Sequence, residues 1–170
     1  MIHLSIDTQK NSAKWNRAFP RMSQKIGQTA SLAFLSSKKT APFKNKNVAI
    51  TVVLSTDAMI KKLNHDFRDQ NKPTNVLSFP HRYNKNQKDI YLGDIVLAFE
   101  TLKRECKRDK KTLEQHTIHL VVHGVLHLLG YDHMTAKDAK NMEKLECDIL
   151  SVLGYPDPYH DKRSQKKAGR

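Results

Sequence analysis

The sequence predicts one α+β domain, built on a small mixed β-sheet of about four strands with helices packed on it. Short segments rich in β-branched residues are separated by longer segments in which apolar residues recur every three or four positions. A chain of 170 residues, 38% of them hydrophobic, is long enough to bury one such core. We expect the domain to span residues 1–159 and residues 160–170 to form a flexible basic tail.

The amino-terminal part of the chain predicts one strand, one interrupted helix and one loop. Residues 2–6 alternate apolar and polar side chains, which is typical of a strand. Residues 12–35 have helical periodicity, broken near Pro20. The expected inner face of this helix consists of Met22, Ile26, Ala30, Ala33 and Phe34. The polar and basic residues 36–47 predict a surface loop.

The next segments predict a strand followed by a helix. Residues 48–54 are rich in Val and Ile, and residues 55–57 supply the Ser, Thr and Asp side chains that cap helix starts. The helix that begins there ends at Arg68. Its expected buried stripe consists of Met59, Ile60, Leu63 and Phe67.

Two further strands are expected at residues 74–79 and 91–99, separated by the short polar loop 81–88. Strands joined by so short a loop usually pair in the antiparallel direction, because a parallel connection needs a longer crossover. The sequence therefore indicates a mixed sheet rather than a fully parallel one.

A helical segment over residues 100–111 carries the densest group of basic side chains. Lys103, Lys107 and Lys111 recur at four-residue steps, with Arg104 beside them. Such a stripe can follow a phosphate backbone, and Lys103, Arg104 and Lys107 are our candidates for nucleic-acid contact. It can equally be a solvated helix face, and the pattern leaves both readings open.

One helix and the turn after it carry the strongest functional signal. Thr112 opens a helix in which His123 and His127 lie four residues apart and so project from one face. Their imidazole nitrogens can reach one tetrahedral metal ion. Gly130 permits a left-handed conformation that ends the helix, and His133 can return after the turn as a third ligand.

The surroundings of these histidines favour a metal. Apolar side chains stand on almost every side of the helix, at Leu120, Val121, Val122, Val125, Leu126, Leu128 and Leu129. An unpaired buried imidazole costs about 1–3 kcal/mol, which metal binding would offset. The spacing is that of the metzincin signature H-E-x-x-H-x-x-G-x-x-H, but Gly124 replaces the general-base glutamate. The pattern predicts one Zn²⁺ per chain and argues against ordinary zinc-peptidase chemistry.

His119 lies four residues before His123 and is an alternative ligand. Histidines at successive four-residue steps turn by about 40° per step away from one metal centre, whereas His133 can return to it. We therefore expect His119 to support a ligand or to belong to the core. We expect Asp132 to orient a ligand imidazole or to polarise bound water.

The last helix is expected to begin at Thr135, which with Asp138 resembles a capping box, and to end at Gly154. Its expected buried stripe consists of Met142, Leu145, Ile149 and Val152. We expect this helix to brace the metal-bearing helix.

The bulk composition points to a polyanionic partner. Lys and Arg number 30 against 17 Asp and Glu, a formal net charge of +13. The two isolated cysteines and the absence of a secretory signal fit a cytoplasmic location. No apolar run approaches the roughly 20 residues of a membrane helix, so we expect no membrane partner.

Several stretches carry a resemblance to one family. Residues 123–133, HGVLHLLGYDH, resemble the H-G-x-L-H-L-x-G-Y-D-H signature of the YbeY family of bacterial rRNA-maturation endoribonucleases. Residues 72–80, KPTNVLSFP, and residues 92–95, LGDI, resemble the second and third blocks of that family. Residues 154–159 are similar to its usual end.

This resemblance implies a fold similar to the zincin-like hydrolases and a zinc-dependent, single-strand-specific endoribonuclease. It implies a role in maturing the 3′ end of 16S rRNA and in ribosome quality control, with single-stranded rRNA and the ribosome or its subunits as partners. The family's arginine before the second block matches Arg68, which would then be catalytic. A guanidinium can fork onto a phosphodiester and oppose the charge of the transition state. Lys72, which opens the block, is a further candidate for RNA contact.

Two other functions stay open at this point. One is another metal-dependent hydrolase, such as a peptidase with an unusual base. The other is a noncatalytic ribosome-binding factor with a structural zinc. Metal-dependent cleavage of RNA, and not of casein, would separate a ribonuclease from both.

Overall fold

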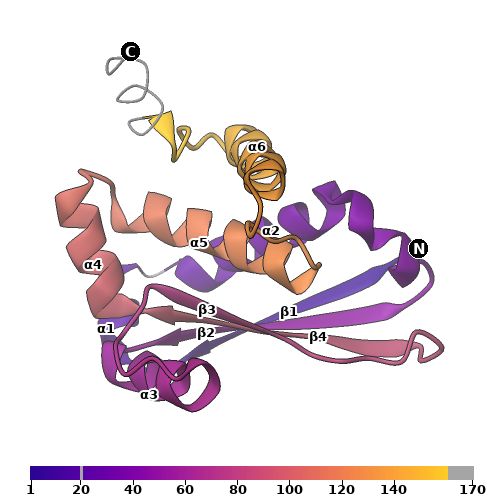
Figure 1. Ribbon diagram of the computed structural model, residues 1–170, viewed down its shortest axis with the longest axis horizontal. Helices are drawn as coiled ribbons and strands as arrows, with labels where there is room; N and C mark the ends of the chain where they lie inside the picture. Colours follow the sequence, from indigo (N-terminus) through magenta and orange to yellow (C-terminus); the bar gives the residue numbers. More distant parts are fainter. Residues whose placement is uncertain (20, 161–170) are drawn as a thin grey trace.

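The computed structural model describes residues 1–19 and 21–160. Pro20, where a helix break was predicted, lies outside these residues, as does the predicted basic tail apart from His160. Within the described residues, a four-stranded sheet carries helices on both faces (Figure 1).

The sheet has the strand order β1-β2-β4-β3. β1 (His3–Lys10) pairs in parallel with β2 (Asn47–Ser55), and β2 pairs in parallel with β4 (Asp89–Ala98). β3 (Val76–Pro80) is antiparallel to β4. The predicted mixed sheet is therefore confirmed, as is the antiparallel pairing across the short loop. Because β3 is an edge strand, one of its sides has no neighbouring strand among residues 1–19 and 21–160.

The helices form layers around the sheet (Figure 1). They are α1 (Ala13–Ala18), α2 (Met22–Ser36), the 3₁₀ helix η1 (Lys38–Phe43), α3 (Asp57–Arg68), α4 (Phe99–Arg108), α5 (Leu113–Leu128) and α6 (Ala136–Val152). α2 and α5 cover one face and α6 packs on α5, while α3 covers the opposite face. α1 and α4 lie at the end of the sheet where β1 and β4 finish.

The main core fills the space between the sheet and the α2–α5 layer. All five residues predicted for the inner face of the first helical segment are buried, because α2 contacts both β1 and α5. Trp15 closes one end, and its indole N–H donates to the Ser55 carbonyl at 2.8 Å. A smaller cluster under α3 contains Ile60, Leu77, Val96 and Ala98.

The predicted buried stripe of α3 is only partly correct. Ile60 is fully buried, but Met59 is 43% and Phe67 is 67% exposed. The strongest contacts of α3 with the sheet are to β3 and β4, so one narrow strip of the helix faces apolar atoms. The Phe67 ring instead packs edge-on against Phe79, with centroids 5.2 Å apart.

The predictions for α6 and α4 also need correction. Val152 is 75% exposed, because α6 packs on α5 and not on the sheet, so its last turn lies beyond the apolar contact. α4 ends at Arg108, and Lys110 is left-handed with φ 52°. Lys111 is thereby removed from the basic stripe, and its ammonium donates to the Pro158 carbonyl at 3.0 Å.

The segment predicted as a surface loop at residues 36–47 contains η1, which is anchored by the buried Phe43. The ring of Phe43 packs against Phe34 of α2, with centroids 5.5 Å apart. No helix among the described residues is both long and apolar enough to cross a membrane.

Candidate metal centre

α5 presents two of the three predicted ligands. Its start is fixed by a capping box, in which the Thr112 hydroxyl accepts the Gln115 N–H and the Gln115 side chain accepts the Thr112 N–H. Its apolar sides are buried between the sheet, α2 and α6. His123 and His127 project from one face, four residues apart, and line the same pocket.

Gly124 is required by the packing of α5 on β4. A Cβ atom at this position would lie 2.7 Å from Cγ2 of Ile95, much closer than carbon atoms can approach. The position at which a metzincin carries its general-base glutamate therefore faces the sheet and has no space for a side chain. This contact gives a physical reason for the glycine in the signature.

The turn after α5 returns the chain to the same face. Gly130 has φ +78°, the left-handed conformation that was predicted, and the Tyr131 N–H donates to the Leu126 carbonyl at 3.0 Å. The Lys39 ammonium donates to the Gly130 carbonyl and lies 4.3 Å from the centroid of the Tyr131 ring. These contacts brace the turn that carries His133.

The structure brings the three histidines together. The His133 ring centroid lies 5.7 Å from that of His123 and 5.1 Å from that of His127. One nitrogen from each ring can be chosen so that all three lie within 4.8 Å of one another. Three convergent imidazoles with this separation can hold one metal ion.

The hydrogen bonds at Nδ1 of His123 and His127 show which ring nitrogens remain available to a cation. The His127 Nδ1 lies 3.0 Å from the Tyr131 carbonyl, and the His123 Nδ1 lies 2.7 Å from a carboxylate oxygen of Glu146. Both partners only accept, so both Nδ1 atoms carry the proton. The two Nε2 atoms then face each other 3.0 Å apart with lone pairs and no proton between them. A cation between them would relieve this repulsion, so the donor set fits a metal.

The charge state of His127 agrees with this reading. Burial, together with the nearby His123 and His133, lowers the pKa of His127 to about 4. His127 is therefore neutral near pH 7, and the neutral imidazole is the form that binds a metal.

Glu146 was not predicted from the sequence, but its carboxylate contacts the histidine cluster through His123. It is fully buried in α6 beneath α5, and burial alone would raise its pKa. Hydrogen bonds from His119 and His123 outweigh burial and hold the pKa of Glu146 at about 2, so the carboxylate stays ionised. The signal was present, because Glu146 lies four residues after Met142 and three before Ile149, on the buried side of the helix.

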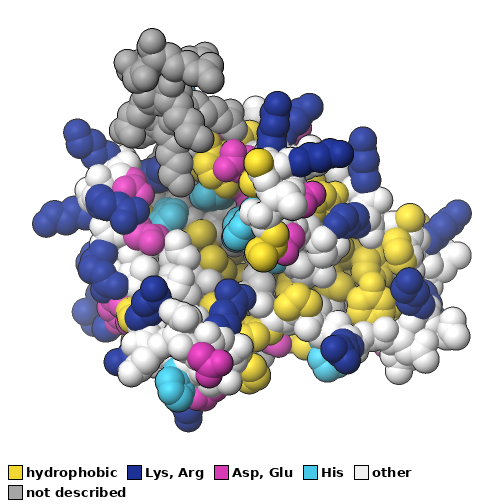
Figure 2. Space-filling model, in the orientation of Figure 1, with side chains coloured by type: hydrophobic (Ala, Val, Ile, Leu, Met, Phe, Trp, Pro, Cys, Tyr) yellow, Lys and Arg dark blue, Asp and Glu magenta, His cyan; other side chains and the backbone are white. Residues whose placement is uncertain are grey.

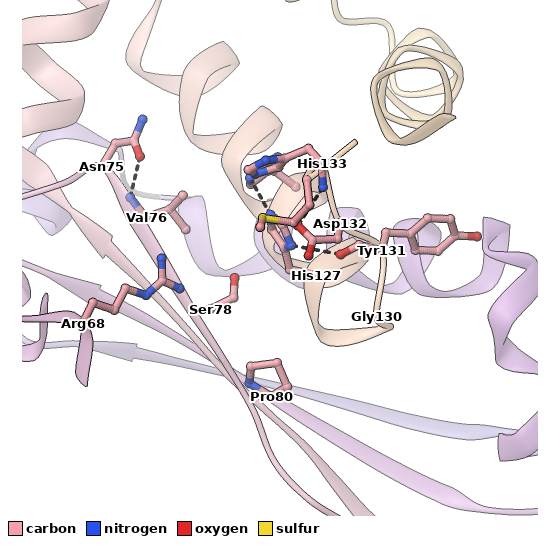
Figure 3. Close-up of a pocket in the computed structure, with 12 residues that line it drawn as sticks. Arg68, Asn75, Val76, Ser78, Pro80, His127, Gly130, Tyr131, Asp132 and His133 are labelled. Carbon is pink, nitrogen blue, oxygen red and sulfur yellow. Dashed lines mark hydrogen bonds between the residues drawn. The ribbon is translucent and has the colours of Figure 1, made fainter. Parts of the chain in front are cut away.

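The three clustered histidines form one wall of a pocket of about 560 Å³ (Figure 3). The opposite wall comes from the end of α3 and from β3, where Arg68 extends toward the histidines. The complete lining is Arg68, Asn75, Val76, Ser78, Pro80, His123, His127, Gly130, Tyr131, Asp132, His133 and Met134. Residues about 60 positions apart in the sequence thus face one another across a single cavity.

The remaining predicted site residues lie in three different places. Asp132 lines the pocket, and its carboxylate accepts the backbone N–H of His133 at 2.7 Å. His119 lies outside the pocket lining, and its Nε2 is 3.2 Å from Glu146. Lys72 lies in the loop between α3 and β3, where its carbonyl accepts from Asn64 at 2.7 Å.

The three basic residues predicted on α4 line a separate groove of about 770 Å³ between α1 and α4. Lys14 and Arg17 of α1 join Lys103, Arg104 and Lys107 there, although the two helices are far apart in the sequence. In the view of Figure 2, Lys and Arg side chains stand along much of the outline of the molecule.

Comparisons with known proteins agree with this geometry. The family model described as "Endoribonuclease YbeY" matches residues 8–154. A protein named endoribonuclease YbeY from Agrobacterium fabrum is 41% identical over 160 residues, which cover 93% of this chain and 94% of the relative. The protein of the same name from Paramagnetospirillum magneticum is 41% identical over 150 residues, covering 85% and 89%. That from Sinorhizobium fredii is 45% identical over 132 residues, covering 76% of each.

One solved structure, from Thermotoga maritima, is 24% identical and aligns with a TM-score of 0.48 over 93% of this chain and 98% of that one. The family model alone extends over most of the described residues, including α3, β3 and the whole histidine motif. This chain therefore belongs to the endoribonuclease YbeY family.

Proposed function

We propose that this protein is a zinc-dependent endoribonuclease that cuts single-stranded RNA. The proposed biological role is maturation of the 3′ end of 16S rRNA and ribosome quality control, with the ribosome or its subunits as partners and the cytoplasm as the setting. Family membership supports RNA as the substrate. The observation that carries the proposal is the pocket in which three imidazoles and the Arg68 guanidinium face one another.

His123, His127 and His133 are the residues that would hold the zinc ion. When bound, zinc supplies Lewis acidity, which polarises a phosphoryl oxygen and makes a nearby water molecule more acidic. The protein keeps the ligands in place beforehand, because the Nδ1 protons of His123 and His127 are already committed to Glu146 and to the Tyr131 carbonyl.

Arg68 is proposed to bind the scissile phosphate from the opposite wall. Its guanidinium stays charged at any physiological pH and can donate two parallel N–H bonds to phosphate oxygens. It ends α3, where Asp69 takes the left-handed conformation with φ 54° and turns the chain toward β3. As an extra negative charge develops on the phosphate, these donors would stabilise it more strongly than the ground state.

The edge position of β3 gives RNA a route into the pocket. Val76, Ser78 and Pro80 line the cavity, and no further strand in the described part of the chain covers the outer side of β3. An extended strand of RNA can therefore run along this edge and place one phosphate between Arg68 and the histidines. Lys72, in the loop that leads into β3, is proposed to contact the same strand.

We further propose that the α1–α4 groove binds the RNA backbone away from the cleaved bond. Arg104 pairs with Asp57 at 2.9 Å, and Lys14 pairs with Glu100, so both of these cations are partly neutralised. Within the described residues, three cations at this groove form no ion pair: Arg17, Lys103 and Lys107. Unpaired cations at a groove are the features that attract phosphates.

The experiment compares zinc-loaded protein on single-stranded RNA, duplex RNA and casein, with His127→Ala and Arg68→Ala in parallel. His127→Ala should lose zinc and cleavage, and Arg68→Ala should keep zinc but lose most of its cleavage. Casein hydrolysis without RNA cleavage would favour a peptidase. RNA binding that survives chelation, without any cleavage, would favour a noncatalytic ribosome-binding factor.

A further inference from the structure

The last described segment of the chain, residues 155–160, forms a strap that crosses back over α5 and α6. It follows directly after the part matched by the family model, which ends at residue 154. The Tyr155 hydroxyl donates to Glu114 at 2.6 Å, and Lys111 donates to the Pro158 carbonyl at 3.0 Å. The strap is therefore tied to the start of α5 at two points.

Its third attachment leads toward the metal centre. The Tyr159 hydroxyl donates to Oε2 of Glu146, and its ring packs edge-on against His119, with centroids 5.5 Å apart. The Nε2 atom of His119 lies 3.2 Å from the same carboxylate oxygen. Burial and the charge of Glu146 raise the pKa of Tyr159, so its hydroxyl stays protonated and remains a donor.

Glu146 divides its two oxygens between these partners and a predicted ligand. Oε2 is held by Tyr159 and His119, and Oε1 accepts the Nδ1 proton of His123 at 2.7 Å. The carboxylate is 0% exposed, so water cannot replace a lost donor at its surface. The rotation of this carboxylate is therefore determined by the strap on one side and by His123 on the other.

We infer that Tyr159 and His119 are positioning residues for the metal centre. By fixing the Glu146 carboxylate, they hold His123 in the tautomer and orientation that leave Nε2 for the metal. Outer partners of this type orient the imidazole and raise its basicity as a ligand. The inference rests on the metal centre of the proposed function, and it makes zinc affinity depend on a strap that contains no zinc ligand.

The test compares Tyr159→Phe with Tyr155→Phe in the full chain. Each substitution removes one hydroxyl from the strap, but only the first hydroxyl contacts Glu146. The zinc dissociation constant, measured by competition with a chromophoric chelator, should rise about tenfold in Tyr159→Phe and about 10–100-fold in Glu146→Gln. It should be unchanged in Tyr155→Phe.

A second readout is independent of activity and of metal. In the zinc-free protein, the Nδ1 proton of His123 should give a downfield imidazole resonance in NMR spectra, because it is bonded to a charged acceptor. Tyr159→Phe should move this resonance, whereas Tyr155→Phe should leave it in place. A contact that merely anchored the strap would change neither the resonance nor the zinc affinity.

Equal zinc affinities in Tyr159→Phe and the parent, with an unmoved resonance, would overturn the inference. Equal losses in Tyr155→Phe and Tyr159→Phe would also overturn it, because the effect would then belong to the strap as a whole. If Tyr159→Phe does not fold, His119→Gln, which keeps a donor at the end of its side chain, should weaken zinc binding less than His119→Ala. If the unsubstituted protein binds zinc and the variants behave as expected, but RNA is not cleaved, the proposed function would be refuted and the inference about Tyr159 and His119 would stand.

Discussion

The contact between α5 and β4 at Gly124 allows a quantitative prediction for Gly124→Ala. The new Cβ would lie 2.7 Å from Cγ2, 3.0 Å from Cδ1 and 3.1 Å from Cγ1 of Ile95. Ile95 is fully buried, and its Cγ2 branches directly from Cβ, so it cannot swing away as the tip of a longer side chain would. Either α5 must rise from the sheet or Ile95 must leave its rotamer.

The expected magnitude follows from two opposing terms. Replacing glycine by alanine in a helix interior normally stabilises a protein by about 0.8–1 kcal/mol. Overpacking a core by one carbon costs about 1–3 kcal/mol. The matched control is Gly27→Ala in α2, where nothing lies within 4 Å of the new Cβ. The free energies of unfolding of the two variants should therefore differ by about 1–3 kcal/mol, with Gly27→Ala the more stable.

Urea unfolding measures this difference from the transition midpoints, provided that the slope stays constant. A double-mutant cycle that combines Gly124→Ala with Ile95→Ala tests whether contact with Ile95 causes the difference. Ile95→Ala should cost about 2–5 kcal/mol alone and distinctly less in the Gly124→Ala background, where the new methyl group occupies part of the cavity. Equal midpoints for Gly124→Ala and Gly27→Ala, or strict additivity in the cycle, would refute the packing argument.

Three further predictions concern the metal, the Glu105 carboxylate and the groove. Zinc present at 1,000 times its dissociation constant should stabilise the folded protein by about 4 kcal/mol. Removal of zinc by a chelator should therefore lower the Tm measured by calorimetry by roughly 8–16 °C. An unchanged Tm would contradict a metal site in the folded state. Burial acts to raise the pKa of Glu105, but hydrogen bonds from His116 and Asn75 outweigh burial and lower the pKa. The stabilisation that the ionised carboxylate gives the fold is therefore complete above about pH 4.5 and is lost as the pH falls through the lowered pKa. Glu105→Gln should flatten this acid limb of the unfolding free energy, and an unaltered limb would speak against the role of these hydrogen bonds. Lys103→Glu should reduce the slope of log K against log salt for single-stranded RNA by about 0.7, and an equal reduction in Lys140→Glu on α6 would assign the effect to net charge.

The clustering of the three histidines could be predicted from the sequence because their arrangement is local. Eleven residues contain the i, i+4 pair and the turn, and helix geometry with one left-handed glycine is enough to bring His133 back toward His123 and His127. The strands and helices were predictable for a similar reason, since period 2 and period 3.6 are properties of neighbouring residues. The mixed sheet followed from the shortness of a single loop.

The tertiary structure decided what depends on the packing of distant elements. Periodicity showed that α3 and α6 had apolar faces but not how wide a strip would be covered, which is why Phe67 and Val152 are exposed. Family resemblance pointed to Arg68, but only the juxtaposition of α3, β3 and α5 sets it opposite the histidines. The spacing of apolar residues places Glu146 on the buried side of α6, but only the packing of α6 on α5 supplies its histidine partners. Hydrogen-bond partners are properties of the folded chain rather than of any one segment.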